Sequence, residues 1–275
     1  IASCLVGSEM CIRDRNIGIN FAKGDYILFL DGDDILPNSA LSTLYHEITT
    51  NSFDAYGYNW AWLLMKDKNN SLQYESYLPM RRDLDILEKP KDSLMKKFIE
   101  MGMDGSVIYT LVKRSLIIDN NIVFQGGLHE DIFFIFQVYY FSKNIKSIDN
   151  VLYLKRKREG SIVNSISKKH IDGYLFAWNQ IYKFIWDRNN EIYEKYKNNF
   201  HSGIFGVFAV LIGSIYKSKS EKKDRIELLI HLEKCRNYFF KTYFEKRALL
   251  STTRYDKITS LFLNSFRNNS SKTKA

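Results

Sequence analysis

The chain has 275 residues, of which 45% are hydrophobic and 15% aromatic, so it can bury a sizeable core, which argues against global disorder. Its formal net charge of +9 favours anionic partners such as nucleotides, phosphorylated lipids, acidic membranes or nucleic acid, although a lysine-rich solvated surface would give the same balance. Cys4, Cys11 and Cys235 lack metal-ligand spacing, which argues against a disulfide framework and a zinc site and fits a reducing cytoplasm. No apolar run reaches the roughly 18 residues of a membrane-spanning helix. The nearest, residues 203–216, is expected to be a buried helix.

The first residues, IASCLVGSEMCIRDR, resemble a translated sequencing-adapter tail. They have neither the basic region nor the long apolar run of a secretory signal peptide. We therefore expect residues 1–14 to be a non-native leader and the natural N-terminus to be missing; a genuine but uninformative leader is the alternative.

The next two predicted elements end at a cluster of acids. Residues 16–25 predict a short helix that ends at Gly24, a residue favoured just after helices. The run YILFL, residues 26–30, has the length and composition of a strand buried on both faces. Three carboxylates follow the C-terminal end of this strand: Asp31, Asp33 and Asp34.

A helix is predicted directly after the acids, over residues 35–50, with Asn38 or Ser39 as its cap. The apolar residues expected to share one face of this helix are Leu41, Leu44, Tyr45 and Ile48. Residues 53–65 predict a second strand, and residues 66–90 are charged and loop-like.

Strands and helices alternate through the middle of the chain, and helices alone follow. The pattern predicts a helix at 91–101, a strand or helix followed by a helix and a turn at 106–124, an apolar helix within 126–143, two short strands and a basic loop at 145–162, and helices from about 168 to a disordered tail at 266–275. This alternation indicates an α/β architecture, in which ligands bind beyond the C-terminal ends of strands. The acid cluster lies at such an end.

Asp31 and Asp33 have the spacing of ligands to a divalent cation. Mg²⁺ or Mn²⁺ at a phosphate site takes one or two protein carboxylates, and phosphate oxygens and water complete the shell. Gly32 between the two acids permits a tight turn, and an ion would offset their mutual repulsion. Capping of the following helix is the alternative and explains Asp34 well, but it does not explain three acids after a buried strand. We therefore predict a metal–phosphate site here.

Two further clusters carry charge. His129, Glu130 and Asp131 precede an apolar helix, a place where carboxylates often serve only as caps. The run KRKREGSI, residues 155–162, is either solvated surface or a clamp for a diphosphate, which guanidinium groups bind well.

Taken in chain order, the acid cluster, the acidic pair and the basic run resemble the motifs of the family 2 glycosyltransferases with the GT-A fold. These are bacterial enzymes of capsule, lipopolysaccharide and teichoic acid synthesis. The resemblance covers residues 15–165, and segment 109–124 also fits the family's stretch before its acidic pair. The matching residues are Arg15, Asn16, Gly18, Ala22, Lys23, Gly24, Asp31, Gly32, Asp33, Asp34, Glu130, Asp131, Arg156, Arg158, Ser161 and Ile162. It implies an α/β fold with a mostly parallel, Rossmann-like sheet flanked by helices in residues 15–165, and a helical C-terminal region at 166–265.

The resemblance also implies roles for five residues. Asp33 would bind Mn²⁺ or Mg²⁺ against the donor diphosphate, while Asp31 would face the donor ribose and metal-bound water. Asp131 would be the general base, and Arg158, with Arg156, would steady the leaving diphosphate. Elementary chemistry agrees, because a sugar hydroxyl must lose its proton to a base and the departing diphosphate gains charge that cations stabilise. In-line attack would invert the anomeric centre.

The remaining implied site residues are Asn16 and Asp34 on the donor side and His129 and Glu130 on the acceptor side. The implied partners are a nucleotide-sugar donor and a glycan or lipid-linked acceptor, and no nucleic acid is expected. The enzyme would be cytoplasmic, with peripheral contact to the anionic inner face of the membrane through the lysine- and aromatic-rich region 166–265. A helical bundle that only caps the catalytic domain is the alternative role of that region.

The family pattern begins earlier, with a strand of the type IIxPxYN and a second strand that ends in an acid-rich DDGS motif. Neither precedes Arg15. We therefore expect a sheet without its first strands, a nucleotide pocket without one wall, and a truncated, inactive chain.

Two other functions stay open at this point. A nucleotidyltransferase also uses paired acids and a metal. A non-enzymatic module could bind nucleic acid or another anion through interleaved Tyr, Phe and Lys, although no nucleic-acid motif is present.

Overall fold

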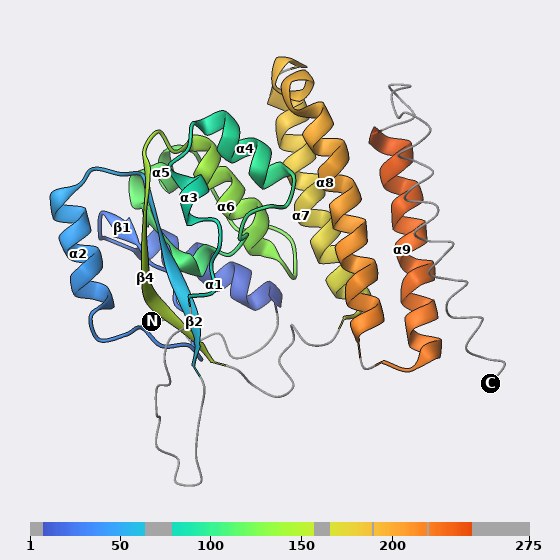
Figure 1. The fold of residues 1–275 in the computed structure, drawn as a ribbon, viewed down its shortest axis with the longest axis horizontal. Helices are drawn as coiled ribbons and strands as arrows, with labels where there is room; N and C mark the ends of the chain where they lie inside the picture. The colour runs from blue at the N-terminus through green and yellow to red at the C-terminus, as the bar shows by residue number, and fades with distance from the viewer. Residues whose placement is uncertain (1–7, 64–78, 157–165, 189, 219, 244–275) are drawn as a thin grey trace, which may run out of the picture.

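The computed structural model describes residues 8–63, 79–156, 166–188, 190–218 and 220–243. The elements in chain order are α1 (Ser8–Phe21), β1 (Tyr26–Ile27), α2 (Ala40–Thr50), β2 (Ala55–Leu63), α3 (Leu84–Leu87), α4 (Lys91–Ile99), the 3-10 turn η1 (Val107–Tyr109), β3 (Thr110–Lys113), α5 (Arg114–Asp119), α6 (Glu130–Phe141), β4 (Ile145–Arg156), α7 (Lys168–Arg188), α8 (Asn190–Lys217) and α9 (Lys222–Tyr243). Figure 1 shows an α/β part beside a group of three long helices, α7 to α9.

The four described strands form one sheet in the order β1-β3-β2-β4. β3 pairs antiparallel with both β1 and β2, and only β2 and β4 are parallel. The predicted α/β class is therefore confirmed, whereas the expected mostly parallel sheet is corrected to a mixed one. The residue pattern of a strand reports its burial and not its direction, so the sequence could not reveal the antiparallel pairs.

The strand predicted at 26–30 pairs in the sheet only through Tyr26 and Ile27. The chain then continues to the acids and returns to the sheet at Ile35, which exchanges backbone hydrogen bonds of 3.0 and 2.8 Å with Leu154 of β4. Within the loop the Asp34 N–H donates to the Asp31 carbonyl at 3.0 Å, closing a turn. The acidic turn is thus attached to the end of β4.

Helix α2 buries less than its pattern predicts. Leu44 is buried, but Leu41 and Tyr45 of the expected apolar face are 62% and 69% exposed. Figure 1 shows the reason, because α2 lies at the edge of the α/β part and only one side of it meets the rest of the fold. Ser39 holds the N-cap position, as predicted, without a side-chain hydrogen bond to the helix.

Other expectations differ from the structure mainly at their ends. The predicted helix at 16–25 is α1, which already begins at Ser8, within the expected leader, and ends at Phe21. The two short strands expected at 145–162 are one strand, β4, whose pairing with β2 shifts register near Asn59. The rest of the basic run lies outside the described residues, as do residues 1–7 and the tail at 266–275.

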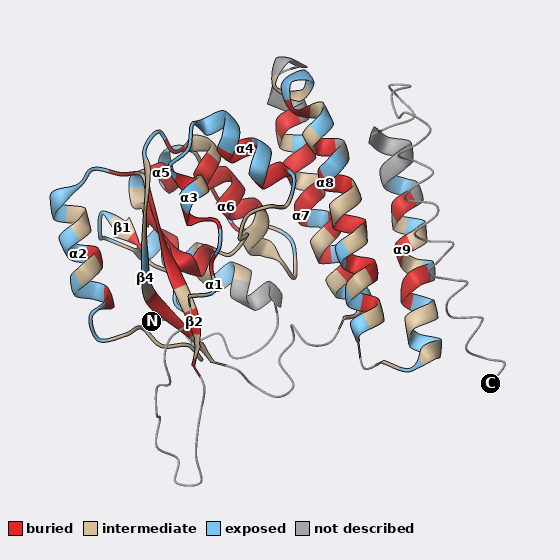
Figure 2. Ribbon diagram, viewed as in Figure 1, coloured by how far each residue is buried: buried red, intermediate tan, exposed pale blue. Residues whose placement is uncertain are grey.

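Helix α6 forms the centre of the core, because it is apolar on every side and buried along most of its length. α7 packs against α6, and α8 packs against α4 and α7, so the main hydrophobic core continues into the helical region (Figure 2). Two glycines permit close contact: a Cβ on Gly173 of α7 would lie 2.4 Å from the Leu128 carbonyl oxygen, and one on Gly203 of α8 would lie 2.0 Å from that of Ile99.

The apolar run at 203–216 lies in α8, as expected of a helix that contributes to the core. Its buried residues are Ile204, Val207, Phe208, Leu211, Ile212 and Ile215. By length and composition alone, Ile192–Lys217 could also cross a membrane, and 47% of its most apolar stretch is buried.

Candidate active site

A cleft of about 420 Å³ lies where the start of α6, the end of β4 and the side of α7 meet. Its charged or ionisable lining residues are Arg15, Asp31, Asp104, His129, Glu130, Asp131 and Lys155. The other lining consists mainly of Phe98, Met101, Met103, Ile108, Ile132, Tyr174 and Trp178. Arg15 and Asp31, from the first predicted motifs, and Lys155, from the last, therefore line the same cleft. One wall of this cleft is polar and the other is apolar.

Arg15 connects the two acidic clusters. Its guanidinium donates to Asp31 at 2.8 Å and to Glu130 and Asp131 at 2.7 Å each. The same group lies 5.3 Å from the centre of the Phe124 ring. Burial opposes the charge of Arg15, but the three carboxylates raise its pKa above its ordinary value. The chain thus supplies its own cation where three acids converge.

Asp131 is fixed by donors on both of its oxygens. Oδ1 accepts from Arg15, and Oδ2 accepts from the Ser106 hydroxyl at 3.0 Å and the Val107 N–H at 3.3 Å. The start of α6 presents the carboxylate, and the segment before η1 supplies two of the donors. This arrangement positions the side chain rather than leaving it free to rotate.

His129 begins α6 with a positive φ of 67°, an uncommon backbone for a residue other than glycine. Its ring makes edge-type contacts with Tyr174 and His170, with ring centroids 5.1 and 5.9 Å away. Burial and then His170 lower the pKa of His129 to about 4, against the opposing effect of Asp131. The imidazole is therefore neutral at neutral pH.

Among the acids of this cluster, Glu130 has the most strongly shifted pKa. Burial, and then the adjacent Asp131 carboxylate, raise the pKa of Glu130 above its ordinary value, while Arg15 opposes the shift. A glutamic acid in this position can hold a proton nearer to neutral pH than an exposed one does.

The acidic turn is held by β4. The Tyr153 hydroxyl donates to the Asp34 carboxylate at 2.7 Å and accepts the Asp31 N–H at 3.2 Å, while the Arg156 N–H donates to Asp34 at 2.8 Å. Burial raises the pKa of Asp34 despite these two donors. Both Asp34 oxygens thus have partners within the protein. Asp33 lies at the turn itself, half-buried and outside the lining of the cleft.

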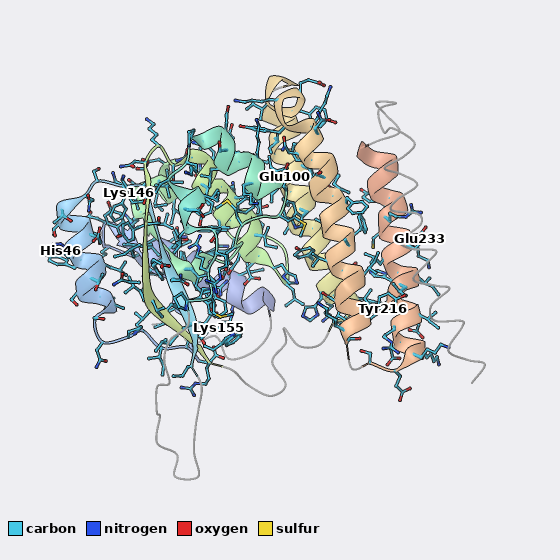
Figure 3. All side chains as sticks on the ribbon, viewed as in Figure 1. His46, Glu100, Lys146, Lys155, Tyr216 and Glu233 are labelled. Carbon is cyan, nitrogen blue, oxygen red and sulfur yellow. The ribbon has the colours of Figure 1, made fainter. Side chains whose placement is uncertain are left out.

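Asn16 and Arg156 also lie outside the lining of the cleft. The Asn16 amide donates to the Phe124 carbonyl at 3.0 Å and accepts the Phe124 N–H at 2.9 Å, so it fixes the loop before α6. Arg156 follows Lys155 on a strand, where successive side chains point to opposite faces, and Lys155 is the one that lines the cleft. Figure 3 labels Lys155 near the lower ends of β2 and β4. Arg158 lies outside the described residues.

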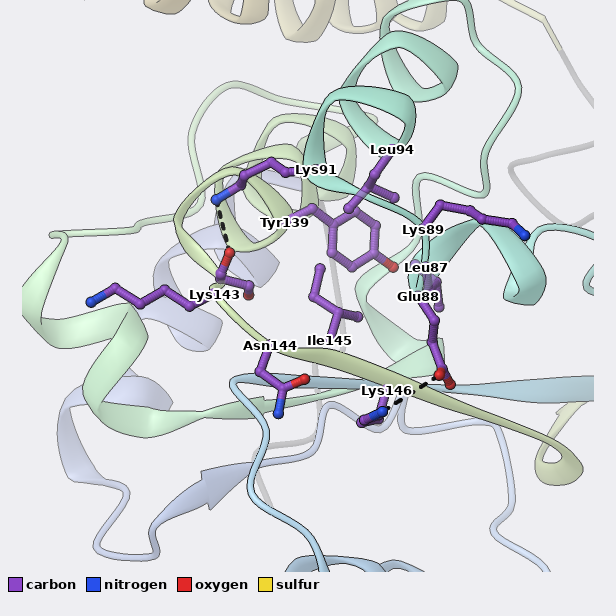
Figure 4. Close-up of a pocket in the computed structure, with 11 residues that line it drawn as sticks. Leu87, Glu88, Lys89, Lys91, Leu94, Tyr139, Lys143, Asn144, Ile145 and Lys146 are labelled. Carbon is purple, nitrogen blue, oxygen red and sulfur yellow. Dashed lines mark hydrogen bonds and ion pairs between the residues drawn. The ribbon is translucent and has the colours of Figure 1, made fainter.

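A second, smaller hollow of about 160 Å³ lies at the opposite ends of α6 and β4 (Figure 4). Lys91 donates to the Ser142 carbonyl there at 2.8 Å, and Lys146 pairs with Glu88 at 3.6 Å. None of the predicted site residues lines it. Four of the predicted site residues, Asp31, His129, Glu130 and Asp131, line the larger cleft instead.

Residues 8–109 match the family model described as glycosyl transferase family 2. This match covers less than half of the chain and indicates that residues 8–109 are similar to a glycosyltransferase family 2 domain. Among known proteins, it is 28% identical over 163 residues to a cholesterol galactosyltransferase of Borreliella burgdorferi, covering 57% of this chain and 44% of the relative. It is 27% identical over 243 residues to the poly(ribitol-phosphate) beta-N-acetylglucosaminyltransferase TarP of Staphylococcus aureus, covering 81% of this chain and 66% of TarP. The chain thus spans less than half the length of the first of these relatives.

A solved structure, S. aureus TarS 1–349 in complex with UDP-GlcNAc, aligns with 80% of this chain and 66% of its own length, at 17% identity and a TM-score of 0.44. The family 2 match includes the acidic turn and ends at Tyr109. Glu130, Asp131 and Lys155 lie beyond it, and the fold brings them to the acidic turn.

Three lining residues of the cleft, Arg15, Lys155 and Tyr174, had no individual role predicted from the sequence. Arg15 belongs to the recognised motif, but nothing in the pattern shows that it meets acids from both clusters. Lys155 was visible only as one member of a basic run. Tyr174 comes from α7, a region assigned to a separate helical part, and no local signal in the sequence indicates that it reaches the cleft.

Proposed function

We propose that this family 2 domain catalyses metal-dependent, inverting transfer of a sugar from a nucleotide-sugar donor to a glycan or lipid-linked acceptor. The observation that carries the proposal is the Asp131 carboxylate, held at the wall of a cleft and linked through Arg15 to Asp31 of the acidic turn. The relatives, whose names describe transfer to cholesterol and to poly(ribitol-phosphate), support this acceptor class.

Asp131 is the proposed general base, and its hydrogen bonds indicate which oxygen acts. A carboxylate oxygen has two lone pairs. Within the described part of the chain, Oδ2 accepts two hydrogen bonds, from Ser106 and Val107, whereas Oδ1 accepts one, from Arg15. We therefore assign proton acceptance from the acceptor hydroxyl to Oδ1, where the proton moves as the new bond to the anomeric carbon forms.

The acidic turn is the proposed site of Mn²⁺ or Mg²⁺, with Asp33 as the direct ligand and Asp31 beside it. The donor set fits these ions, because both offer carboxylate oxygens at a turn anchored to β4 through Tyr153 and the Asp34 carboxylate. When bound, the ion supplies positive charge against the donor diphosphate. We propose that Asp34 fixes the turn instead of touching the donor, since both its oxygens already have partners.

Cations of the chain itself would stabilise the leaving diphosphate. Arg15 and Lys155 both line the cleft, and we propose them for this role together with Arg158. Arg156 contributes its N–H to the turn, and we assign its side chain a secondary part. Positive groups fixed in place before the reaction stabilise developing negative charge without reorganising.

The acceptor is proposed to bind beside His129 and Glu130, against the apolar wall. A neutral His129 imidazole can accept or donate a hydrogen bond to a sugar hydroxyl. Tyr174 and Trp178 offer flat apolar faces on which a sugar ring or a lipid-linked group can rest. Asn16, which holds the Phe124 backbone, is proposed to position Arg15 and the loop before α6.

We place the activity in cell-surface polysaccharide synthesis at the cytoplasmic side of the membrane. The lysine- and aromatic-rich helices after residue 166 suit peripheral contact with anionic lipid. Binding of the protein to vesicles with anionic lipid, but not to neutral ones, is the expected result.

The proposal is tested by Asp131→Asn in the product of the complete coding sequence. This change keeps the size and most hydrogen-bond partners of the side chain but removes its capacity as a base. We expect sugar transfer to fall about 10²–10⁴-fold while donor binding is retained. The matched control is Asp104→Asn, another acid of the same cleft without a role in proton transfer. Transfer at the wild-type rate by Asp131→Asn would exclude Asp131 as the base, and the anomeric configuration of the product, read by NMR, tests inversion.

A further inference from the structure

A second cluster of chemically active side chains lies outside the cleft, between α7 and α9. It consists of Asp172, His231 and Cys235. His231 Nε2 lies 2.6 Å from Asp172 Oδ1, and the Cys235 sulfur lies 3.8 Å from that nitrogen and 3.9 Å from that oxygen. Three different ligand atoms therefore meet at one point, although Asp172 lies 59 residues before His231 in the sequence.

The helices create this convergence. His231 and Cys235 are four residues apart on α9, so both side chains lie on one face of the helix. The preceding turns of the same two helices are joined by Lys168 and Glu227, at 3.8 Å. α7 and α9 thus face each other over two successive turns, and the Asp172 carboxylate is aimed at the His231–Cys235 face.

We propose that Asp172, His231 and Cys235 bind a borderline-soft divalent cation of the Zn²⁺ type, with water as the fourth ligand. Thiolate, imidazole and carboxylate are the usual ligands of zinc, whereas Mg²⁺ and Mn²⁺ prefer oxygen alone. With ordinary zinc bond lengths, a tetrahedral ion holds such ligand atoms about 3.3–3.6 Å apart. The observed separations of 2.6, 3.8 and 3.9 Å bracket that range, so small side-chain rotations suffice.

Partial exposure leaves room for the fourth ligand. The Asp172 side chain is 55% exposed and that of His231 26%. The ion would connect α9 to α7, the helix that presents Tyr174 to the cleft. The plain alternative is a hydrogen bond between Asp172 and His231 with an uninvolved thiol next to it, and the spacing of the cysteines alone gave no sign of either arrangement.

Cobalt(II) is the probe that distinguishes these possibilities, because its bond to a thiolate gives a near-ultraviolet charge-transfer band that an all-oxygen site cannot produce. The protein is the full chain with Cys4→Ser and Cys11→Ser, so that Cys235 is its single thiol. We expect the band to saturate at one Co²⁺ per chain and Zn²⁺ to abolish it, since Zn²⁺ binds such sites more tightly. The band should persist in Asp33→Asn, which alters the proposed donor site.

Three ligand variants decide the outcome. Cys235→Ser should abolish the band, and His231→Gln and Asp172→Asn should each weaken Co²⁺ binding about tenfold or more. His46→Gln, at an exposed imidazole on α2, is the control and should leave the band unchanged. Far-ultraviolet circular dichroism confirms that each variant is folded, and the exposed Asp172 makes Asp172→Asn the variant least dependent on packing. Absence of a stoichiometric band in the parent, its persistence in Cys235→Ser, or Co²⁺ affinity in His231→Gln and Asp172→Asn equal to that of the parent would overturn the site.

Discussion

Arg15 is the residue on which the electrostatics of the cleft depend. Its side chain is 20% exposed, and its guanidinium contacts Asp31, Glu130 and Asp131, whose side chains are 35%, 14% and 19% exposed. Three acids this close repel one another, and the arginine offsets that repulsion. A fixed cation between Asp31 of the acidic turn and the proposed base Asp131 also keeps both carboxylates oriented before any substrate arrives.

Arg15→Ala is expected to lower the free energy of unfolding by about 2–4 kcal/mol, because it leaves part-buried carboxylates without their partner. This loss of unfolding free energy should be smaller near about pH 5 than near about pH 8. At the lower pH Glu130 is protonated, which relieves the repulsion between the carboxylates. Urea unfolding at both pH values measures this. Arg13→Ala, on the same helix and 71% exposed, is the control and should change stability by less than about 0.5 kcal/mol. Equal effects of the two variants would show that Arg15 does not hold the cluster.

His129 makes stability depend on pH in a direction that can be worked out. Its folded-state pKa, about 4, lies below the ordinary value of 6.5, so the folded protein favours the neutral ring. The neutral ring therefore stabilises the folded protein fully above pH 6.5. This stabilisation is lost as the pH falls through the folded-state pKa of about 4. The groups that face the ring are His170 and Tyr174 from α7 and Asp131 from α6.

His129→Asn removes the titrating ring and keeps a residue that tolerates a positive φ. As the pH falls from 6.5 to 4, the unfolding free energy of the wild type should decrease by on the order of 2–3 kcal/mol more than that of the variant. Unfolding free energies measured across that range give the difference directly. His46→Asn, at an exposed position, is the control and should follow the wild type. Parallel curves for wild type and His129→Asn would contradict the buried, neutral imidazole.

At the residue scale, the sequence predicted which acids carry charge, but not which partners they have. Asp31, Asp33 and Asp131 could be singled out because their positions after a strand and before a helix are visible locally. The hydrogen bonds of Asp34 to β4 and of Asn16 to Phe124 depend on contacts between distant segments. No pattern within either segment encodes such contacts.

At the scale of elements, the approach of α8 to α4 is set by one missing side chain. Gly203 is buried, and a Cβ there would lie 2.0 Å from the Ile99 carbonyl oxygen, which is backbone and cannot rotate away. Alanine is favoured over glycine within a helix by up to about 1 kcal/mol, but this overlap exceeds that gain. Gly213, on the same helix, has nothing within 4 Å of its Cβ position.

We therefore expect opposite effects from the same substitution on α8. Gly203→Ala should destabilise the protein by about 1–3 kcal/mol, whereas Gly213→Ala should be neutral or stabilising by up to about 1 kcal/mol. Thermal or urea unfolding followed by circular dichroism measures both. If Gly203→Ala is as stable as Gly213→Ala, α8 does not approach the Ile99 backbone as closely as described.

Element positions were predictable where hydrophobic pattern and length agreed, as for β2, α4 and α6. Strand direction was not, and the antiparallel β3 makes the sheet mixed. α2 shows a second limit, because Leu41 and Tyr45 share a helical face that no neighbouring element covers. Periodicity indicates which residues can be buried together, and only the packing decides which are.

At the scale of the whole molecule, the cleft joins parts that the sequence suggested were separate. The acidic turn lies within the family 2 match, the proposed base and Lys155 lie beyond it, and α7 adds Tyr174 and Trp178. The α/β part and helix α7 therefore line one cleft together. This organisation gives the two acidic clusters different proposed tasks, one binding a metal–diphosphate and the other accepting a proton.

The most direct test of that division is calorimetric titration of nucleoside diphosphates, with and without Mn²⁺, into the product of the complete coding sequence. Wild type and Asp131→Asn should bind one of these diphosphates only when Mn²⁺ is present, and with similar affinity. Asp33→Asn should weaken that binding about tenfold or more, since it removes the proposed direct ligand. Binding by Asp33→Asn equal to that of the wild type, or binding that is independent of Mn²⁺, would contradict the account.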